Sequence, residues 1–136
     1  MRNYAATIDA LWNAGYIKEG DYVIICQDEP PASAGFFGLI SAAVAMASCK
    51  HYVLAANNYG LNFFDIDKRT GDYLNTGWAV KREEIIKLSI RGFGRTVVIK
   101  RAGGTERYST ANRFYGYRQK EAVTAAKNFL KTNYVK

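Results

Sequence analysis

Three runs of alternating apolar and polar residues, separated only by glycine-containing turns, fill residues 83–110. The runs cover 83–91, 95–101 and 105–110, and the turns lie at 92–94 and 102–104. A period of two is typical of half-buried strands, and glycine between such runs favours tight chain reversals. The segment therefore predicts a three-stranded β-meander. Its inner face is expected to carry Ile86, Leu88, Ile90, Val97 and Ile99.

Shorter strand signals precede the meander. The continuous apolar run at 22–26 predicts a buried strand, and 51–56 with 60–66 predict a hairpin around the turn at 57–60. Residues 73–80 predict a strand that leads into the meander. Short strands at this spacing favour an antiparallel barrel or sandwich over a parallel sheet.

Helical periodicity is found at both ends of the chain. Residues 3–13 predict a short amphipathic helix whose apolar stripe is Tyr4, Ile8, Leu11 and Trp12. This helix is expected to close one end of the core, with a membrane-surface position as the alternative. Residues 118–133 predict a second helix that packs over the sheet. Its apolar stripe comprises Ala122, Val123, Ala126, Phe129 and Leu130.

The segment between the first two predicted strands is apolar, with no charged residue from Pro30 to Cys49. About fifteen residues of helix would reach roughly 22 Å, which is shorter than the ~30 Å hydrocarbon layer of a bilayer. The segment could pack on its own sheet, associate with a second copy, or insert into a membrane as a loop. Small residues on one stripe permit close approach to another element. The candidate residues for self-association are Gly38, Leu39, Ala42, Ala45 and Met46.

Charge is distributed unevenly along the chain. Residues 1–80 carry five basic and eight acidic side chains, whereas residues 81–136 carry fourteen basic and four acidic ones. This asymmetry indicates an anionic partner for the second half of the chain, or a basic face that is simply solvated. If the predicted strands pair, the candidate residues for anion or lipid binding share one sheet face. They are Lys87, Arg91, Lys100 and Arg107.

Arginines and aromatic residues also alternate just before the second helix. Interleaved arginines and rings can hold single-stranded nucleic acid by phosphate contact and base stacking. In the alternative interpretation, the rings close one end of the barrel and the arginines remain in solvent. The candidate nucleic-acid-binding residues are Arg113, Tyr115, Tyr117 and Arg118.

The sequence offers no catalytic constellation. His51 is the single histidine, and no pattern sets Cys26, Cys49 or Ser48 against it as a nucleophile. The two cysteines match neither a disulfide framework nor a metal spacing, and no apolar run follows the N-terminus as in a secretory signal. We therefore expect a non-enzymatic protein without cofactor, metal or catalytic residues. The expected location is the cytoplasm or the inner face of the membrane.

The order of the predicted elements resembles that of bacterial pleckstrin-homology-like (PH-like) domains. The likeness covers about residues 21–135 and is strongest where 78–80 lead into 84–90, followed by the strand at 97–99, a Gly-Gly turn and the helix beginning near Arg118. It implies a mainly β (α+β) fold of about seven antiparallel strands capped by the C-terminal helix. Residues 1–20 would form an N-terminal helical segment and 21–136 the PH-like domain, with an apolar helical insertion at 32–49.

This fold implies a binding or scaffolding module, although a fold alone does not transfer a function. Eukaryotic relatives often use basic residues of the first loop to bind inositol phosphates, whereas residues 32–49 are uncharged here. The sequence therefore favours self-association or protein binding over the alternatives. These alternatives are an anionic membrane surface and, less strongly, single-stranded nucleic acid.

Overall fold

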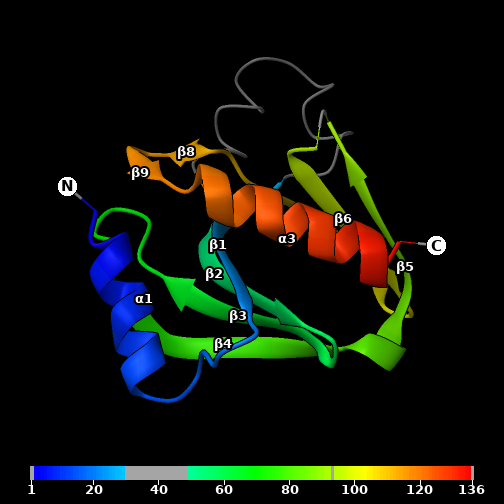
Figure 1. Ribbon diagram of the computed structural model, residues 1–136, viewed down its shortest axis with the longest axis horizontal. Coiled ribbons are helices and arrows are strands. Elements are labelled where there is room, and N and C mark those ends of the chain that lie inside the picture. The colour runs from blue at the N-terminus through cyan, green and yellow to red at the C-terminus, as the bar shows by residue number, and fades with distance from the viewer. Residues whose placement is uncertain (1, 30–48, 93, 136) are drawn as a thin grey trace.

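The computed structural model describes residues 2–29, 49–92 and 94–135 (Figure 1). Strand is the most frequent secondary structure in this part of the chain. The strands are β1 (Tyr22–Asp28), β2 (His51–Asn57), β3 (Gly60–Ile66), β4 (Tyr73–Lys81), β5 (Ile85–Arg91), β6 (Thr96–Arg101), β7 (Gly104–Ser109), β8 (Arg113–Phe114) and β9 (Tyr117–Arg118). The helices are α1 (Tyr4–Asn13) and α3 (Lys120–Asn133), and a 3-10 turn (Arg82–Glu84) joins β4 to β5.

The seven longer strands form one antiparallel sheet in the order β4-β3-β2-β1-β7-β6-β5. Strands β4 and β5 are consecutive in the chain, yet they lie at opposite edges of this sheet. Helix α3 contacts both β1 and β5, and in Figure 1 it crosses the molecule in front of the strands. The expected mainly β, PH-like architecture of seven strands with a C-terminal and a short N-terminal helix is confirmed. The apolar insertion expected at 32–49 lies, except for buried Cys49, outside the described residues.

The main core fills the space between the sheet and α3. It draws residues from all seven long strands and from the inner face of the helix, where Val123, Ala126 and Leu130 are buried. Strand β1 contributes Ile24 and Cys26 to this core. The alternation of side chains along a strand sends the intervening Ile25 to the other face of the sheet.

A second core lies on that other face, beneath α1 and the β8–β9 hairpin. Tyr4 and Leu11 of α1 pack there against Ile25 and Val53 of the sheet. Strand β1 is thus covered on both faces, which explains why its sequence is a continuous apolar run rather than an alternating one. The expected position of Trp12 in the helix stripe is wrong, because this side chain is 42% exposed.

Hydrogen bonds tie both helices to the sheet. The Thr7 hydroxyl donates to the Gly71 carbonyl at 2.6 Å, which holds α1 against the β3–β4 turn. At the other end of the molecule, the Tyr134 hydroxyl donates to the Asn57 carbonyl at 2.5 Å. The Arg82 guanidinium lies over the Tyr134 ring, 4.8 Å from its centroid, and donates to the Asn133 carbonyl. These contacts fasten the end of α3 to the β2–β3 and β4–β5 connections.

Candidate anion-binding face

Strands β5, β6 and β7 bring four basic residues onto one face of the sheet. In the register, Lys87 lies opposite Lys100, and Val98 lies between Ser89 and Arg107. Lys87, Ser89 and Arg91 alternate along β5, so they share the face of Lys100, Val98 and Arg107. Lys87, Arg91 and Lys100 are exposed, and Arg107 is partly buried. We call Lys87, Arg91, Lys100 and Arg107 the basic face.

The basic face concentrates positive charge on neighbouring strands. Directly opposed residues of antiparallel strands have Cβ atoms about 5 Å apart, so the Lys87–Lys100 pair is electrostatically unfavourable by itself. Within the described ranges, no ion pair joins a basic-face residue to a carboxylate. Glu29 lies at the border of this face, where its carboxylate accepts from the Thr96 hydroxyl at 3.2 Å and its N–H donates to the Arg107 carbonyl at 2.9 Å. An anion placed over the basic face would relieve this repulsion.

Other acidic residues of the meander engage the opposite face. Glu106 binds the Arg101 guanidinium through both carboxylate oxygens, at 2.7 and 3.0 Å, and also accepts from the Tyr108 hydroxyl at 3.0 Å. Burial and this carboxylate raise the pKa of Tyr108 well above its usual value, so the phenol stays protonated. Glu84 lies 3.7 Å from Arg101. These carboxylates therefore neutralise Arg101 and leave the basic face positive.

A β-bulge at the start of β5 changes the face on which Ile86 lies. Ile85 is opposite Arg101 and Lys87 is opposite Lys100, so two steps along β5 match one step along β6. The extra residue is Ile86, and its side chain is 65% exposed. The prediction that Ile86 belongs to the inner face is therefore wrong, whereas Leu88, Val97 and Ile99 are in the core and Ile90 packs against it. Ile85 takes the inward position instead.

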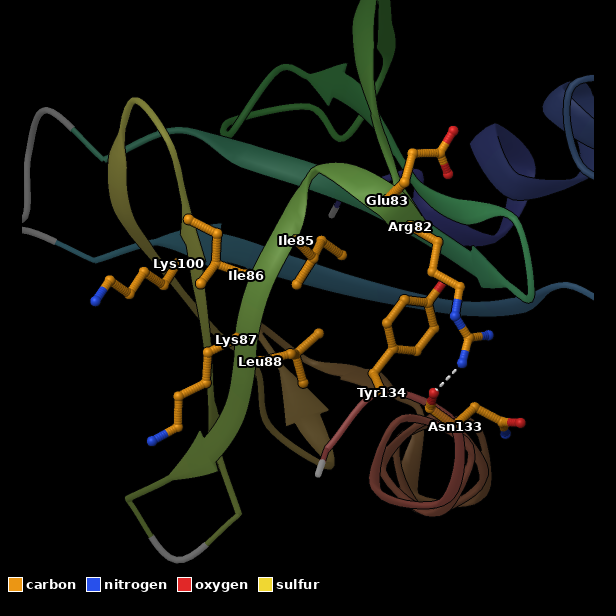
Figure 2. Close-up of a pocket in the computed structure, with 9 residues that line it drawn as sticks. All are labelled: Arg82, Glu83, Ile85, Ile86, Lys87, Leu88, Lys100, Asn133 and Tyr134. Carbon is orange, nitrogen blue, oxygen red and sulfur yellow. Dashed lines mark hydrogen bonds between the residues drawn. The ribbon is translucent and has the colours of Figure 1, made fainter.

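Figure 2 shows the surroundings of this bulge. Ile86, Lys87 and Lys100 project to one side of β5, and Ile85 and Leu88 project toward Tyr134 and α3 on the other. A hollow of about 650 Å³ lies along the β5 edge, and a second hollow of about 610 Å³ lies beside the β6–β7 turn. Ile86 lines both hollows and so forms the ridge between them. Alternation alone could not reveal this ridge, because the bulge interrupts it.

The candidate nucleic-acid-binding residues lie elsewhere, in the β8–β9 hairpin. Arg113 and Arg118 are opposed and exposed. The Arg2 guanidinium lies 4.4 Å from the centroid of the Tyr115 ring, and the His51 ring lies 5.0 Å from the same centroid. The Tyr117 ring packs edge-on to Tyr4 at 5.7 Å. Both tyrosine rings thus have protein partners, and nucleic-acid binding by this hairpin stays a prediction.

The candidate self-association residues at 38–46 lie outside the described residues, so that prediction stays as the sequence made it. Within the described ranges, no helix is long and apolar enough to cross a membrane. The same part of the chain contains no cluster of three or more histidine, cysteine, aspartate or glutamate residues suited to a metal ion.

The single histidine and both cysteines, His51, Cys26 and Cys49, are buried. Burial, followed by the charges of Arg2 and Lys68, lowers the pKa of His51 to about 4. Burial raises the pKa of the Cys26 thiol far above its usual value, and it is also the main cause of the raised pKa of the Cys49 thiol. His51 is therefore neutral near pH 7, and both cysteines are protonated. Neither state favours nucleophilic chemistry at these positions.

The sequence matches no protein-family model and no curated protein. Among solved structures, the chain is similar to the hSac2 domain of the human phosphoinositide phosphatase Sac2, with a TM-score of 0.50 and 12% identity over 98% of this chain and 84% of that one. It is also similar to the C-terminal domain of an unknown protein from Leishmania infantum, with a TM-score of 0.46 and 11% identity over 91% of this chain and 94% of that one.

A third similar structure is the N-terminal PH domain of human ARAP2, with a TM-score of 0.43 and 10% identity over 85% of this chain and 84% of that one. At such identities, structural likeness concerns the fold alone. The PH-like fold follows from the strand order and the terminal helix. Membership of the bacterial branch stays a prediction.

Proposed function

We propose that this chain is a non-enzymatic binding module that docks on an anionic membrane surface through its basic face. The observation that carries the proposal is the register of β5, β6 and β7, which aligns Lys87, Lys100 and Arg107 on one side of the sheet. Buried His51, Cys26 and Cys49 support a role in binding rather than catalysis. A membrane role would give the protein a peripheral position on the cytoplasmic side.

The energetics of the basic face support this choice of partner. Each lysine or arginine held close to an anionic bilayer contributes about 1 kcal/mol, and the attraction falls off over a Debye length of about 10 Å at 0.1 M salt. The four side chains stand on neighbouring strands, so the backbone already fixes their common direction. Little ordering of the protein is required on docking, and binding should weaken steeply as salt is added.

Edge lysines have another recognised purpose, since they discourage edge-to-edge pairing of sheets. Lys87 stands on the edge strand β5, but Lys100 stands on β6, between β5 and β7. Protection of an edge therefore accounts for Lys87 and not for Lys100. Anion binding accounts for both residues.

Vesicle flotation tests the proposal. The chain is mixed with phosphatidylcholine vesicles that contain or lack phosphatidylserine, at several salt concentrations. We expect binding that requires phosphatidylserine and declines with salt. The double variant Lys87→Gln/Lys100→Gln should bind about thirty-fold more weakly, because two charges near the surface are removed.

The matched control is Lys18→Gln/Lys120→Gln, which removes the same charge from two exposed residues outside the meander. This control should bind as the unchanged chain does. Equal weakening by both double variants would show that net charge, rather than the basic face, attracts the membrane. Failure of the unchanged chain to bind phosphatidylserine vesicles at low salt would refute the proposal.

A further inference from the structure

We infer that Ile86 is an apolar anchor that enters the bilayer while Lys87 and Lys100 contact lipid phosphates. The inference rests on the proposed function and deepens it. It names the partner as a lipid bilayer rather than a dissolved polyanion. Its basis is the β-bulge that turns an isoleucine out of the core and onto the side of β5 that carries the two lysines (Figure 2).

Single exposed apolar side chains are common on protein surfaces, so exposure alone does not distinguish Ile86. Its position does. The inward places of this part of β5 are filled by Ile85, which packs against the main core, and by Leu88, which is buried in it. The bulge adds one residue between them, and that residue is isoleucine, 65% exposed. The local backbone thus directs a large apolar side chain away from the protein.

The side chains around Ile86 have the polarity that the surface of a bilayer requires, with cationic groups for the phosphate layer next to an apolar group for the acyl chains. Lys87 follows it in the strand and Lys100 lies opposite Lys87, so cationic groups stand beside the apolar one. Lysine can keep its ammonium group at the level of the phosphates while its aliphatic stem lies deeper. An isoleucine beside such lysines would reach the boundary of the acyl chains. A dissolved anion would gain nothing from it, because the gain comes from removing apolar surface from water.

Two hollows of about 650 and 610 Å³ meet at Ile86, which lines both of them. Glu83 lines both hollows, as Ile86 does, whereas Glu84 and Glu106 line only the second. Phosphatidylserine binding should therefore be stronger in Glu83→Gln than in the unchanged chain.

The test compares Ile86→Ser with Leu74→Ser on the same vesicles. Leu74 is 50% exposed on β4, the opposite edge strand of the sheet, so its replacement is chemically similar but distant from the basic face. We expect Ile86→Ser to lower partition onto phosphatidylserine vesicles about ten-fold, with the salt dependence retained. Leu74→Ser should bind as the unchanged chain does. Equal partition of Ile86→Ser and the unchanged chain would overturn the inference.

A second measurement reports insertion directly and does not depend on the stability of the serine variant. Ile86→Cys is labelled with a nitrobenzoxadiazole dye, and Ala125→Cys, exposed on α3, serves as the control. The unchanged chain, treated in parallel, measures labelling of the buried Cys26 and Cys49. Vesicle addition should shift the emission of the dye at residue 86 to the blue and leave that at residue 125 unchanged.

The two proposals fail in different ways. If the unchanged chain binds vesicles and the dye at residue 86 shows no shift, the anchor is refuted and the basic-face proposal stands. If no vesicle binding occurs, both are refuted. Binding of inorganic polyphosphate should respond to Lys87→Gln/Lys100→Gln and not to Ile86→Ser. An equal loss of polyphosphate binding in Ile86→Ser would also overturn the anchor.

Discussion

The side-chain amide of Gln119 pairs with the backbone of Ile25 in both directions. The Ile25 N–H donates to Gln119 Oε1 at 2.8 Å, and Gln119 Nε2 donates to the Ile25 carbonyl at 3.0 Å. Strand β7 pairs with β1 only at Gln27 and Asp28, so in the described part of the chain no strand lies beside Ile25 on this edge of β1. The Gln119 side chain therefore takes the place of a neighbouring strand at Ile25. Gln119 is also the N-cap residue of α3, so it fixes the start of this helix on the sheet.

Replacing Gln119 with leucine should destabilise the fold by about 2 kcal/mol, because the buried N–H of Ile25 would lose its acceptor. Urea unfolding followed by circular dichroism measures the change. Asn128→Leu, an exposed polar-to-leucine change on the same helix, is the control and should differ little from the unchanged chain. Equal stabilities of Gln119→Leu and the control would contradict the role given to this amide.

Gly77 permits the close approach of β4 to β3. A Cβ atom at this position would lie 2.2 Å from the Phe63 carbonyl oxygen, so Gly77→Ala must displace one strand. We expect a loss of about 2 to 4 kcal/mol in unfolding free energy. The near-ultraviolet circular dichroism should also change, since Trp78 stacks on Phe63 with ring centroids 4.8 Å apart.

Gly103→Ala is the matched control for this prediction. A Cβ atom there meets no heavy atom within 4 Å, and the residue is exposed in the β6–β7 turn. Its stability should stay within about 0.5 kcal/mol of the unchanged chain. If Gly77→Ala were as stable as the unchanged chain, β3 and β4 could not approach each other as closely as described.

His51 should make the stability of the protein depend on pH. Its pKa is about 4 in the folded state and near its usual value of 6.5 in the unfolded state. Between these values the unfolded chain binds a proton that the folded chain does not, so stability falls as pH decreases from 6.5 to 4. The loss is about 3 kcal/mol at most, and the contribution of this group levels off as the pH rises above the unfolded-state pKa.

The test measures the unfolding free energy of the unchanged chain and of His51→Gln between about pH 4.5 and 6.5, which is roughly the window between the two pKa values. The difference between the two proteins isolates the contribution of His51. The variant should be less stable near neutral pH, since the His51 ring is buried against Phe114 and is hydrogen-bonded to the Tyr4 hydroxyl. Its stability should also vary less with pH. Carboxylates titrate in the same range in both proteins, so the difference between the slopes reports His51. Parallel slopes would argue against a depressed pKa.

Self-association through residues 38–46 is a separate expectation of the sequence. If this segment mediates it, light scattering at high protein concentration should give a mass above that of the 15.2 kDa chain. Gly38→Leu should shift the mass toward the monomer, because a large side chain prevents close packing of small-residue stripes. A monomeric mass for the unchanged chain at all concentrations would contradict this expectation.

The sequence predicted the strands well, because each carries its own local signal. The hairpin of β2 and β3, the β5–β6–β7 meander and both helices follow from periodicity and turn residues. Helix α3 begins at Lys120 rather than at 118, since Tyr117 and Arg118 form β9. That two-residue strand exists only through its pairing with β8, and such pairing leaves little trace in a sequence.

The candidate site was predictable in part. Alternation was sufficient to group Lys87, Arg91, Lys100 and Arg107, because strict alternation holds from Lys87 to the end of β5 and along the paired strands. It failed at Ile86, where the bulge gives two successive residues the same direction. The signal that could have shown the irregularity is the Ile85-Ile86 pair, of which strict alternation can place only one member inside.

The contacts of α3 also have a kinetic consequence. Gln119 meets β1 across 94 residues of chain, and Tyr134 meets Asn57 across 77. A ribosome releases β1, β2 and β3 well before residues 119–134, and until then Ile24, Leu54 and Phe63 lack the helix that covers their side of the sheet. Folding dominated by such distant contacts is slow, so the apolar side of these early strands stays exposed to water until the helix has been synthesised.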